Sequence, residues 1–152
     1  MNDDTLSIVT SRIVDADVER AWAAWTEPEQ VAQWWGPAGF TNTVQEMDVR
    51  PGGHWVILMH GPDGTLYPNS STYGEVTRLK KLVILHAESK EFGIAAWRAE
   101  VTFEAMEGQT RVRMAGIFAS VEAKTKHVEE FHAVEGAEES LTRLTEFLTS
   151  AP

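Results

Sequence analysis

The sequence predicts an α+β protein in which a curved antiparallel sheet of about six to seven strands wraps around a long C-terminal helix. Helical patterning is confined to two short stretches near the N-terminus and to the C-terminal part. Strand patterning fills the region from about residue 41 to residue 118. Short turns separate consecutive strands, which is typical of an antiparallel meander. A length of 152 residues suits one ordinary domain, so we expect residues 1–152 to form a single domain.

The N-terminal region predicts one strand and two short helices. Residues 5–14 have a strand pattern, and Asp15 to Asp17 then introduce a helix with carboxylates near its positive end. Residues at helical spacing give that helix one apolar stripe: Val18, Ala21, Trp22 and Trp25. The sequence TEPE at 26–29 has the spacing of a capping box and predicts the second helix, which ends before Gly36-Pro37.

The middle of the chain predicts a series of strands. The segments are 41–49, 54–60, 71–78, 82–88, 96–105 and 109–118, with turn sequences between them. Alternation places two sets of residues on one face of their strands: Trp97, Ala99, Val101 and Phe103, and then Thr110, Val112, Met114, Gly116 and Phe118.

The C-terminal part predicts helices over 120–130 and about 133–149. The longer one has an apolar stripe of Val134, Ala137, Leu141, Leu144 and Leu148. Gly136 lies inside it at a cost of roughly 1 kcal/mol relative to alanine. We therefore expect either a close approach to the sheet or room for a ligand at this glycine. One such helix covers a large sheet only if the sheet bends around it, and this arrangement leaves space for a cavity beside the helix.

Composition excludes several classes of function. The net charge of −10 disfavours nucleic acid and anionic membrane surfaces as partners. The absence of cysteine removes disulfides, thiolate metal sites and a cysteine nucleophile. No apolar run is long enough to insert into a membrane, and the N-terminus lacks the pattern of a signal peptide, so we expect a cytoplasmic protein.

Several segments resemble the START-like, or SRPBCC, superfamily. These are RIVDADVERAWAAWTEPEQVAQWWGP (12–37), MDVRPGGHW (47–55), MHGPDG (59–64), YGEV (73–76) and GAEESLTRLTEFL (136–148). Within the superfamily, the chain is most similar to bacterial homologues of the C-terminal domain of the heat-shock-protein-90 ATPase activator. The resemblance implies a helix-grip fold with an elongated apolar cavity between the sheet and the C-terminal helix. Relatives bind lipids, sterols or polyketides, and a few act as cyclases or hydrolases.

The cavity candidates are mostly aromatic and aliphatic. Trp22 and Trp25 fit core packing, whereas the expected cavity residues are Trp35, Phe40, Met47, Trp55, Ile57, Met59, Tyr73, Trp97, Phe118, His132 and Val134. Among polar side chains, Tyr73, Glu75 or His132 is expected to orient a ligand.

Catalytic and metal-binding patterns are weak. The five histidines lack the spacing of a zinc site, and solvent exposure is the favoured interpretation for them, with His132 as the exception. No pair of carboxylates, nucleophile elbow or phosphate-binding loop stands out. Asp48 and Arg50 are interpreted as organising the turn before Gly52-Gly53. We expect neither a catalytic residue nor a metal or other cofactor.

Three hypotheses for function follow. The first is the binding of a small hydrophobic or amphipathic molecule in the cavity. The second is a cyclase or hydrolase that uses the same cavity and places a titratable group with a perturbed pKa inside it. The third is an interaction module linked to a chaperone or to stress, with an exposed apolar patch. A homodimer is also possible from the sequence, which does not determine the oligomeric state.

Overall fold

The computed structural model describes residues 6–88, 95–130 and 133–150 of the chain. The elements are β1 (Ser7–Val14), α1 (Val18–Thr26), α2 (Pro28–Trp34), β2 (Thr41–Met47), β3 (His54–His60), β4 (Leu66–Thr77), β5 (Lys81–His86), β6 (Trp97–Ala105), β7 (Thr110–Phe118), α3 (Val121–Glu130) and α4 (Ala133–Ser150). This order agrees with the succession of strands and helices that the sequence predicts.

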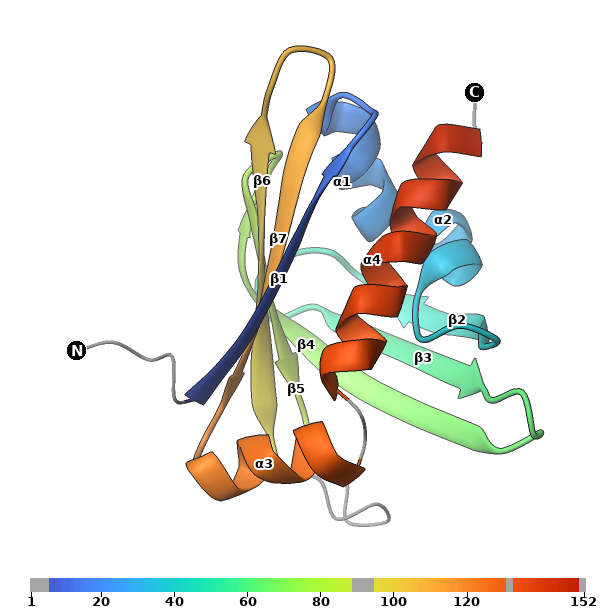
Figure 1. Cartoon of the computed structure of the whole chain (residues 1–152), viewed down its shortest axis with the longest axis vertical. Coiled ribbons are helices and arrows are strands. Elements are labelled where there is room, and N and C mark those ends of the chain that lie inside the picture. The colour runs from blue at the N-terminus through green and yellow to red at the C-terminus, as the bar shows by residue number, and fades with distance from the viewer. Residues whose placement is uncertain (1–5, 89–94, 131–132, 151–152) are drawn as a thin grey trace.

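All seven strands belong to one antiparallel sheet in the order β1-β7-β6-β5-β4-β3-β2. The sheet is strongly twisted, and α4 runs diagonally across its concave side (Figure 1). The short helices α1 and α2 lie near one end of α4, and α3 lies across the opposite end of the sheet. The predicted α+β helix-grip fold is confirmed, with seven strands in the sheet.

The start of α2 differs from the prediction. The Asp17 side chain caps α1 by accepting a hydrogen bond from the backbone N–H of Arg20 at 2.9 Å. The predicted capping box from Thr26 to Glu29 is wrong, because α1 continues through Thr26. The hydroxyl of Thr26 donates back to the carbonyl of Trp22, and Glu27 caps α2 without a side-chain hydrogen bond.

Strand β4 is longer than predicted. It begins at Leu66 rather than near residue 71, and its first residues pair with β3 up to the His60–Leu66 pair. Pro68 and the polar residues around it give no strand signal by themselves. The extension is set by the neighbouring strand, which supplies partners along its whole length.

The core fills the space between the concave face of the sheet, the two short helices and α4. Its centre is made of buried aromatic and aliphatic side chains, and the last helix contributes Leu141, Leu144 and Leu148. The ring centroids of Trp25 and Trp34 lie 4.7 Å apart in an edge-to-face contact. The indole N–H of Trp34 donates to the carbonyl of Ala24 at 2.9 Å, so this fully buried ring leaves no polar atom unpaired.

The turn between β2 and β3 is organised as the sequence predicts. The Nε of Arg50 lies 2.7 Å from Oδ2 of Asp48, and the backbone N–H of Gly53 donates to the carbonyl of Arg50. Gly52 and Gly53 also exchange backbone hydrogen bonds with Tyr73 on β4. The turn therefore holds the end of the β2–β3 hairpin against the next strand.

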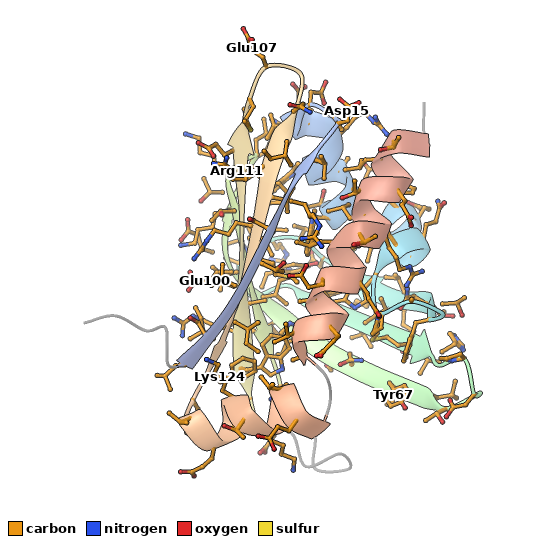
Figure 2. All side chains as sticks on the ribbon, viewed as in Figure 1. Asp15, Tyr67, Glu100, Glu107, Arg111 and Lys124 are labelled. Atoms are coloured by element: carbon orange, nitrogen blue, oxygen red, sulfur yellow. The ribbon has the colours of Figure 1, made fainter. Side chains whose placement is uncertain are left out.

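The outer face of the sheet carries charge. Arg98 pairs with Glu100, and Arg111 pairs across the β6–β7 ladder with Glu104, each at 2.9 Å. Figure 2 shows Glu100 and Arg111 on the side of the sheet away from α4. In the part of the chain that the structure describes, no helix combines the length and the apolar character needed to cross a bilayer.

Candidate ligand-binding site

A pocket of about 240 Å³ lies between the N-terminal half of α4 and the concave face of the sheet. Nearly all of its lining is apolar, and none of the described lining residues is Asp, Glu, Lys or Arg. The lining comprises Ile8, Trp35, Gly36, Pro37, Trp55, Ile57, Met59, Asn69, Ser71, His86, Trp97, Ala99, Met114, Gly116, Phe118, His127, Ala133, Gly136, Ala137 and Ser140.

The structure brings together six of the eleven residues expected from the sequence to line a cavity. They are Trp35, Trp55, Ile57, Met59, Trp97 and Phe118. They come from the segment after α2 and from strands β3, β6 and β7, which face one another only because the sheet curves. Contact between these six residues and a ligand stays a prediction.

The other expected residues lie elsewhere. Tyr73 is buried in the core and stacks on Trp55, with ring centroids 6.3 Å apart. Phe40 packs on Tyr67, and Met47 packs against the edge of the core. Val134 is 40% exposed although its position fits the helical stripe. His132 lies outside the described residues.

Glu75, expected as an orienting group, also lies away from the pocket. Its carboxylate accepts a hydrogen bond from the Thr77 hydroxyl and lies 3.7 Å from the ammonium nitrogen of Lys81, and the residue is exposed. The Tyr73 hydroxyl is buried without a hydrogen-bond partner among the described residues, and burial raises the pKa of this phenol above its usual value. Neither group lines the pocket.

Trp35 forms one side of the pocket and is fixed from two directions. Its ring meets that of Trp55 edge-to-face, with centroids 5.0 Å apart. Its carbonyl oxygen accepts hydrogen bonds from Arg143 on α4 at 3.0 Å and from the side-chain amide of Asn42 at 2.8 Å. The segment after α2 is thereby tied to both α4 and β2.

Two histidines, His86 and His127, form part of the pocket lining. The prediction from the sequence that they are exposed to solvent is wrong. His127 on α3 is buried, with 6% of its surface exposed. His86, at the end of β5, is half-buried as a residue, but its Nε2 atom is inaccessible. The alternation of Leu82, Ile84 and His86 in β5 points all three inward and is the signal that would have identified His86. For His127 we find no comparable signal in its polar helix.

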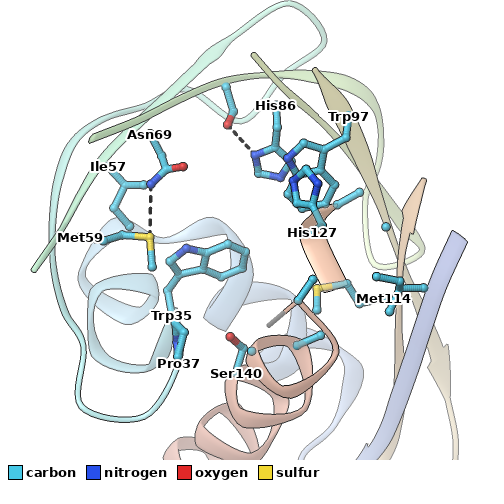
Figure 3. A pocket seen from close by; sticks show the side chains of 18 of the residues that line it. Trp35, Pro37, Ile57, Met59, Asn69, His86, Trp97, Met114, His127 and Ser140 are labelled. Atoms are coloured by element: carbon cyan, nitrogen blue, oxygen red, sulfur yellow. Dashed lines mark hydrogen bonds between the residues drawn. The ribbon is translucent and has the colours of Figure 1, made fainter. Parts of the chain in front are cut away.

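The histidines belong to an aromatic stack. The His86 ring lies parallel to Trp97 with centroids 4.2 Å apart, and Trp97 in turn stacks on Phe118 at 5.3 Å. His127 contacts the rings of both Trp97 and Phe118. In Figure 3, His86, Trp97 and His127 stand together on one side of the pocket, opposite Met59 and Asn69.

Burial keeps both imidazoles neutral at pH 7. It lowers the pKa of His86 to about 4, with a smaller contribution from the neighbouring His127. Burial also lowers the pKa of His127, against the opposing effect of its hydrogen bond with the Ala123 carbonyl at 3.0 Å. Because a carbonyl only accepts, the Nδ1 of His127 carries a proton in that bond. The pocket therefore offers polar groups without net charge.

Two glycines leave room in the walls. A Cβ at Gly116 would lie 3.3 Å from Cζ3 of Trp97, so glycine lets the indole lie close against β7. A Cβ at Gly136 would meet only Cγ of Pro37, at an ordinary 3.8 Å. The backbone at Gly136 is thus not forced against the sheet. Its place in the pocket lining agrees with the second explanation for this glycine, which is space for a ligand.

Metal ligands are not grouped in this pocket. Within residues 6–88, 95–130 and 133–150, no three His, Asp or Glu side chains come close enough together to hold a metal ion. Among the polar groups of the lining, Ser71 and His86 lie together, with their Oγ and Nδ1 atoms 3.0 Å apart.

A curved sheet gripping a C-terminal helix, with an apolar pocket between them, defines a START-like domain. The chain belongs to the family described as activator of Hsp90 ATPase homolog 1-like protein, whose model matches residues 15–149. No curated protein matches the chain. The resemblance noted in the sequence is therefore confirmed at the level of family and fold.

Solved structures from several bacteria share this fold. A protein from Arthrobacter aurescens is 28% identical, with 99% of this chain and 90% of that chain covered and a TM-score of 0.89. A protein from Mycobacterium smegmatis is 28% identical, with coverages of 99% and 95% and a TM-score of 0.84. A protein from Nitrosomonas europaea is 26% identical, with coverages of 98% and 97% and a TM-score of 0.84.

Proposed function

We propose that this protein binds a small, neutral, predominantly apolar molecule in the pocket between α4 and the sheet. The observation that carries the proposal is the composition of the lining, which is mainly aromatic and aliphatic and has no formal charge at pH 7 among the described residues. Burial of apolar ligand surface provides roughly 25 cal/mol per Å² before the costs of association. Lining of this kind with a few polar groups is typical of small-molecule sites.

The size of the pocket limits the ligand. Pockets for drug-sized molecules are roughly 300–1,000 Å³, and this one measures about 240 Å³. We therefore expect a molecule of up to about three small rings, or an equivalent aliphatic one, inside the pocket. This narrows the lipid-, sterol- and polyketide-like ligands considered from the sequence toward the smallest members of those classes.

The proposal is tested with a matched pair of substitutions at Gly136. Gly136→Leu places a branched side chain in the pocket, whereas Gly136→Ala adds one methyl group at an ordinary distance from Pro37. The probe is N-phenyl-1-naphthylamine, a neutral dye that becomes fluorescent in apolar surroundings. Quenching of tryptophan emission provides a second readout, because Trp35, Trp55 and Trp97 line the pocket.

We expect saturable one-to-one binding of the dye by the natural protein and by the alanine variant, and at least tenfold weaker binding by the leucine variant. The alanine variant should also be more stable, by up to roughly 1 kcal/mol, because alanine favours a helix over glycine. Circular dichroism checks that both variants are folded. Absence of dye binding by the folded natural protein, or equal affinity of the leucine variant, would contradict the proposal.

Catalysis in the same pocket is a second candidate, and one observation favours it. The enzyme hypothesis requires an inward titratable group with a perturbed pKa, and the lowered pKa of His86 meets that requirement. The described lining residues, however, include no carboxylate to orient the imidazole or to act as its acid–base partner. Binding alone needs no such group, so we place binding first.

The interaction-module hypothesis has less support. Among the described residues, two exposed large apolar side chains share one face of β1, and the other five lie on β4, β5, α3, α4 and the turn after β6: Val9 and Ile13 on β1, then Leu66, Leu85, Val121, Val134 and Met106. Single exposed apolar residues are normal on protein surfaces. They do not define a docking surface for a protein partner.

A further inference from the structure

Two side-chain nitrogens of pocket-lining residues, Nε2 of His86 and Nε1 of Trp55, are buried without a hydrogen-bond partner in the described part of the chain. Leaving a buried polar group unpaired costs free energy, so such groups are uncommon in native proteins and call for an explanation. Since His86 lines the pocket, a bound molecule can supply the missing partner once a small movement of the ring or of a neighbouring side chain exposes Nε2, which is inaccessible in the conformation described.

The hydrogen bond on the other side of the ring identifies which nitrogen carries the proton. Nδ1 of His86 lies 3.0 Å from Oγ of Ser71, and it is the one side-chain partner that the Ser71 hydroxyl has within the described part of the chain. Ser71 is buried, with 4% of its surface exposed, so water does not readily replace that partner. The hydroxyl hydrogen is satisfied when it is donated to the lone pair of Nδ1. In a neutral imidazole the proton then resides on Nε2.

His86 thus carries an unpaired N–H donor within the pocket wall. The opposite tautomer would have Nδ1 donate to Ser71 and would leave the serine hydrogen without an acceptor. Burial, which lowers the pKa of His86, disfavours the doubly protonated cation. The complementary ligand group is therefore a hydrogen-bond acceptor, and it does not need to be an anion.

The surroundings favour an uncharged acceptor. None of the described lining residues is Lys or Arg, so a buried carboxylate would lack a cationic partner, and burying an unpaired charge is costly. The protein as a whole carries a net charge of −10, which repels anions. A ketone, amide or quinone oxygen avoids both penalties.

The shape of the wall beside His86 indicates the rest of the ligand. The parallel rings of His86, Trp97 and Phe118 form a continuous aromatic surface, which Gly116 allows to lie close to β7. Trp35 and Trp55 form another aromatic part of the lining. Flat ring systems suit such surfaces, because aromatic contacts add to the gain from burial alone.

We propose that the ligand is a small, flat, neutral carbonyl compound whose oxygen accepts a hydrogen bond from the Nε2–H of His86. This inference rests on the proposed function, because it specifies the class of molecule bound in the same pocket. His86 is the specificity-determining residue in this arrangement, and Ser71 is the positioning residue that fixes its tautomer.

The test compares 1-indanone with indane, two probes of similar shape that differ by the carbonyl oxygen. Indane-1-carboxylate serves as the anionic comparison. Affinities are measured by displacement of N-phenyl-1-naphthylamine from the natural protein and from the His86→Phe variant. Phenylalanine keeps a flat ring beside Trp97 but has no N–H to donate.

We expect 1-indanone to bind the natural protein about tenfold more tightly than indane, which corresponds to roughly 1.4 kcal/mol. The carboxylate should bind more weakly than the ketone. In His86→Phe the ratio of the affinities for the ketone and for indane should fall to about one, whatever the substitution does to apolar binding as a whole. Equal affinities of 1-indanone and indane for the natural protein, or an unchanged preference in the variant, would overturn the inference and leave apolar binding intact. Failure of the dye and of all three probes to bind would overturn the proposed function and the inference together.

A second measurement does not depend on the variant. Long-range ¹H–¹⁵N correlation spectra of the natural protein at pH 7 report which ring nitrogen of His86 is protonated. We expect the proton on Nε2 and an unprotonated Nδ1. A proton on Nδ1 would make Nε2 an acceptor and would overturn the inference even if His86→Phe failed to fold.

Discussion

Nη1 of Arg143 on α4 donates a hydrogen bond to the carbonyl oxygen of Trp35, 3.0 Å away and 108 positions earlier in the chain. The same nitrogen lies 3.1 Å from the carbonyl of Gly36 and 2.9 Å from that of Pro37. The half-buried guanidinium of Arg143 therefore donates hydrogen bonds to three carbonyl groups of the segment after α2. Because Trp35, Gly36 and Pro37 all line the pocket, Arg143 connects the gripped helix to the pocket wall without lining the pocket itself.

Replacing Arg143 by methionine should loosen this wall. Hydrogen bonds to a charged group contribute roughly 1.5–3 kcal/mol, and the three bonds here share one donor nitrogen, so we expect a loss of about 2 kcal/mol. Dye affinity should fall as well, because Trp35 is no longer held in place. Urea unfolding and dye titration measure the two effects.

Arg113→Met is the matched control for Arg143→Met. Arg113 is exposed on β7 and makes no side-chain hydrogen bond or ion pair with any described residue. Exposed substitutions of this kind usually change stability by less than roughly 0.5 kcal/mol. Similar losses in the two arginine variants would contradict a specific role for Arg143.

Adjacent glycines in the turn after β2 should respond differently to alanine. A Cβ at Gly53 would clash with the carbonyl oxygen of Asp48, a contact that requires the backbone to move. Gly52 has a positive φ of 83° but open space around it. We expect Gly52→Ala to cost roughly 1–2 kcal/mol from the left-handed conformation, and Gly53→Ala to cost more, roughly 3 kcal/mol or beyond. Thermal or urea unfolding of both variants gives the comparison, and equal costs would contradict the clash.

The protein should lose stability in mild acid because of His86. Its pKa is lowered to about 4 in the folded state by burial and by His127, which faces it from α3. As pH falls below the ordinary value of 6.5, the unfolded chain therefore binds a proton that the folded protein resists. The stability present above pH 6.5 is lost progressively down to about pH 4. Because one pKa unit corresponds to roughly 1.4 kcal/mol, the loss is of the order of 3 kcal/mol.

The His86→Phe variant isolates this contribution. Phenylalanine does not titrate, so the free energy of unfolding of the variant should fall less steeply between pH 6.5 and pH 4. The part of the slope that remains comes from His127, whose pKa is also lowered by burial, and from carboxylates. Urea unfolding at half-unit pH steps measures both curves. Parallel curves for the natural protein and the variant would show that His86 titrates normally in the folded state.

Most of the architecture is predictable from local patterns. Period-two alternation identifies the inward faces of β6 and β7, and the leucine stripe identifies the buried face of α4. Glycine, proline and aspartate mark the turns, as at Asp48 to Gly53. These signals act over a few residues, and the sequence contains them completely. The capping of α2 and the first residues of β4 are less accessible, because a longer α1 and pairing with β3 decide them.

The order of elements, the antiparallel connectivity, the excess negative charge and the family resemblance can all be read from the amino-acid sequence. Which side chains share the pocket depends on how distant segments pack together. This packing brings His86 and His127 from β5 and α3 against Trp97, and it leaves Tyr73 in the core and Val134 partly exposed. Alternation tells which face of a strand a residue occupies. It does not tell whether that part of the concave face is filled by core side chains or is left open as a pocket. That depends on the curvature of the sheet and on the path of α4 across it, which arise from packing between segments distant in the chain.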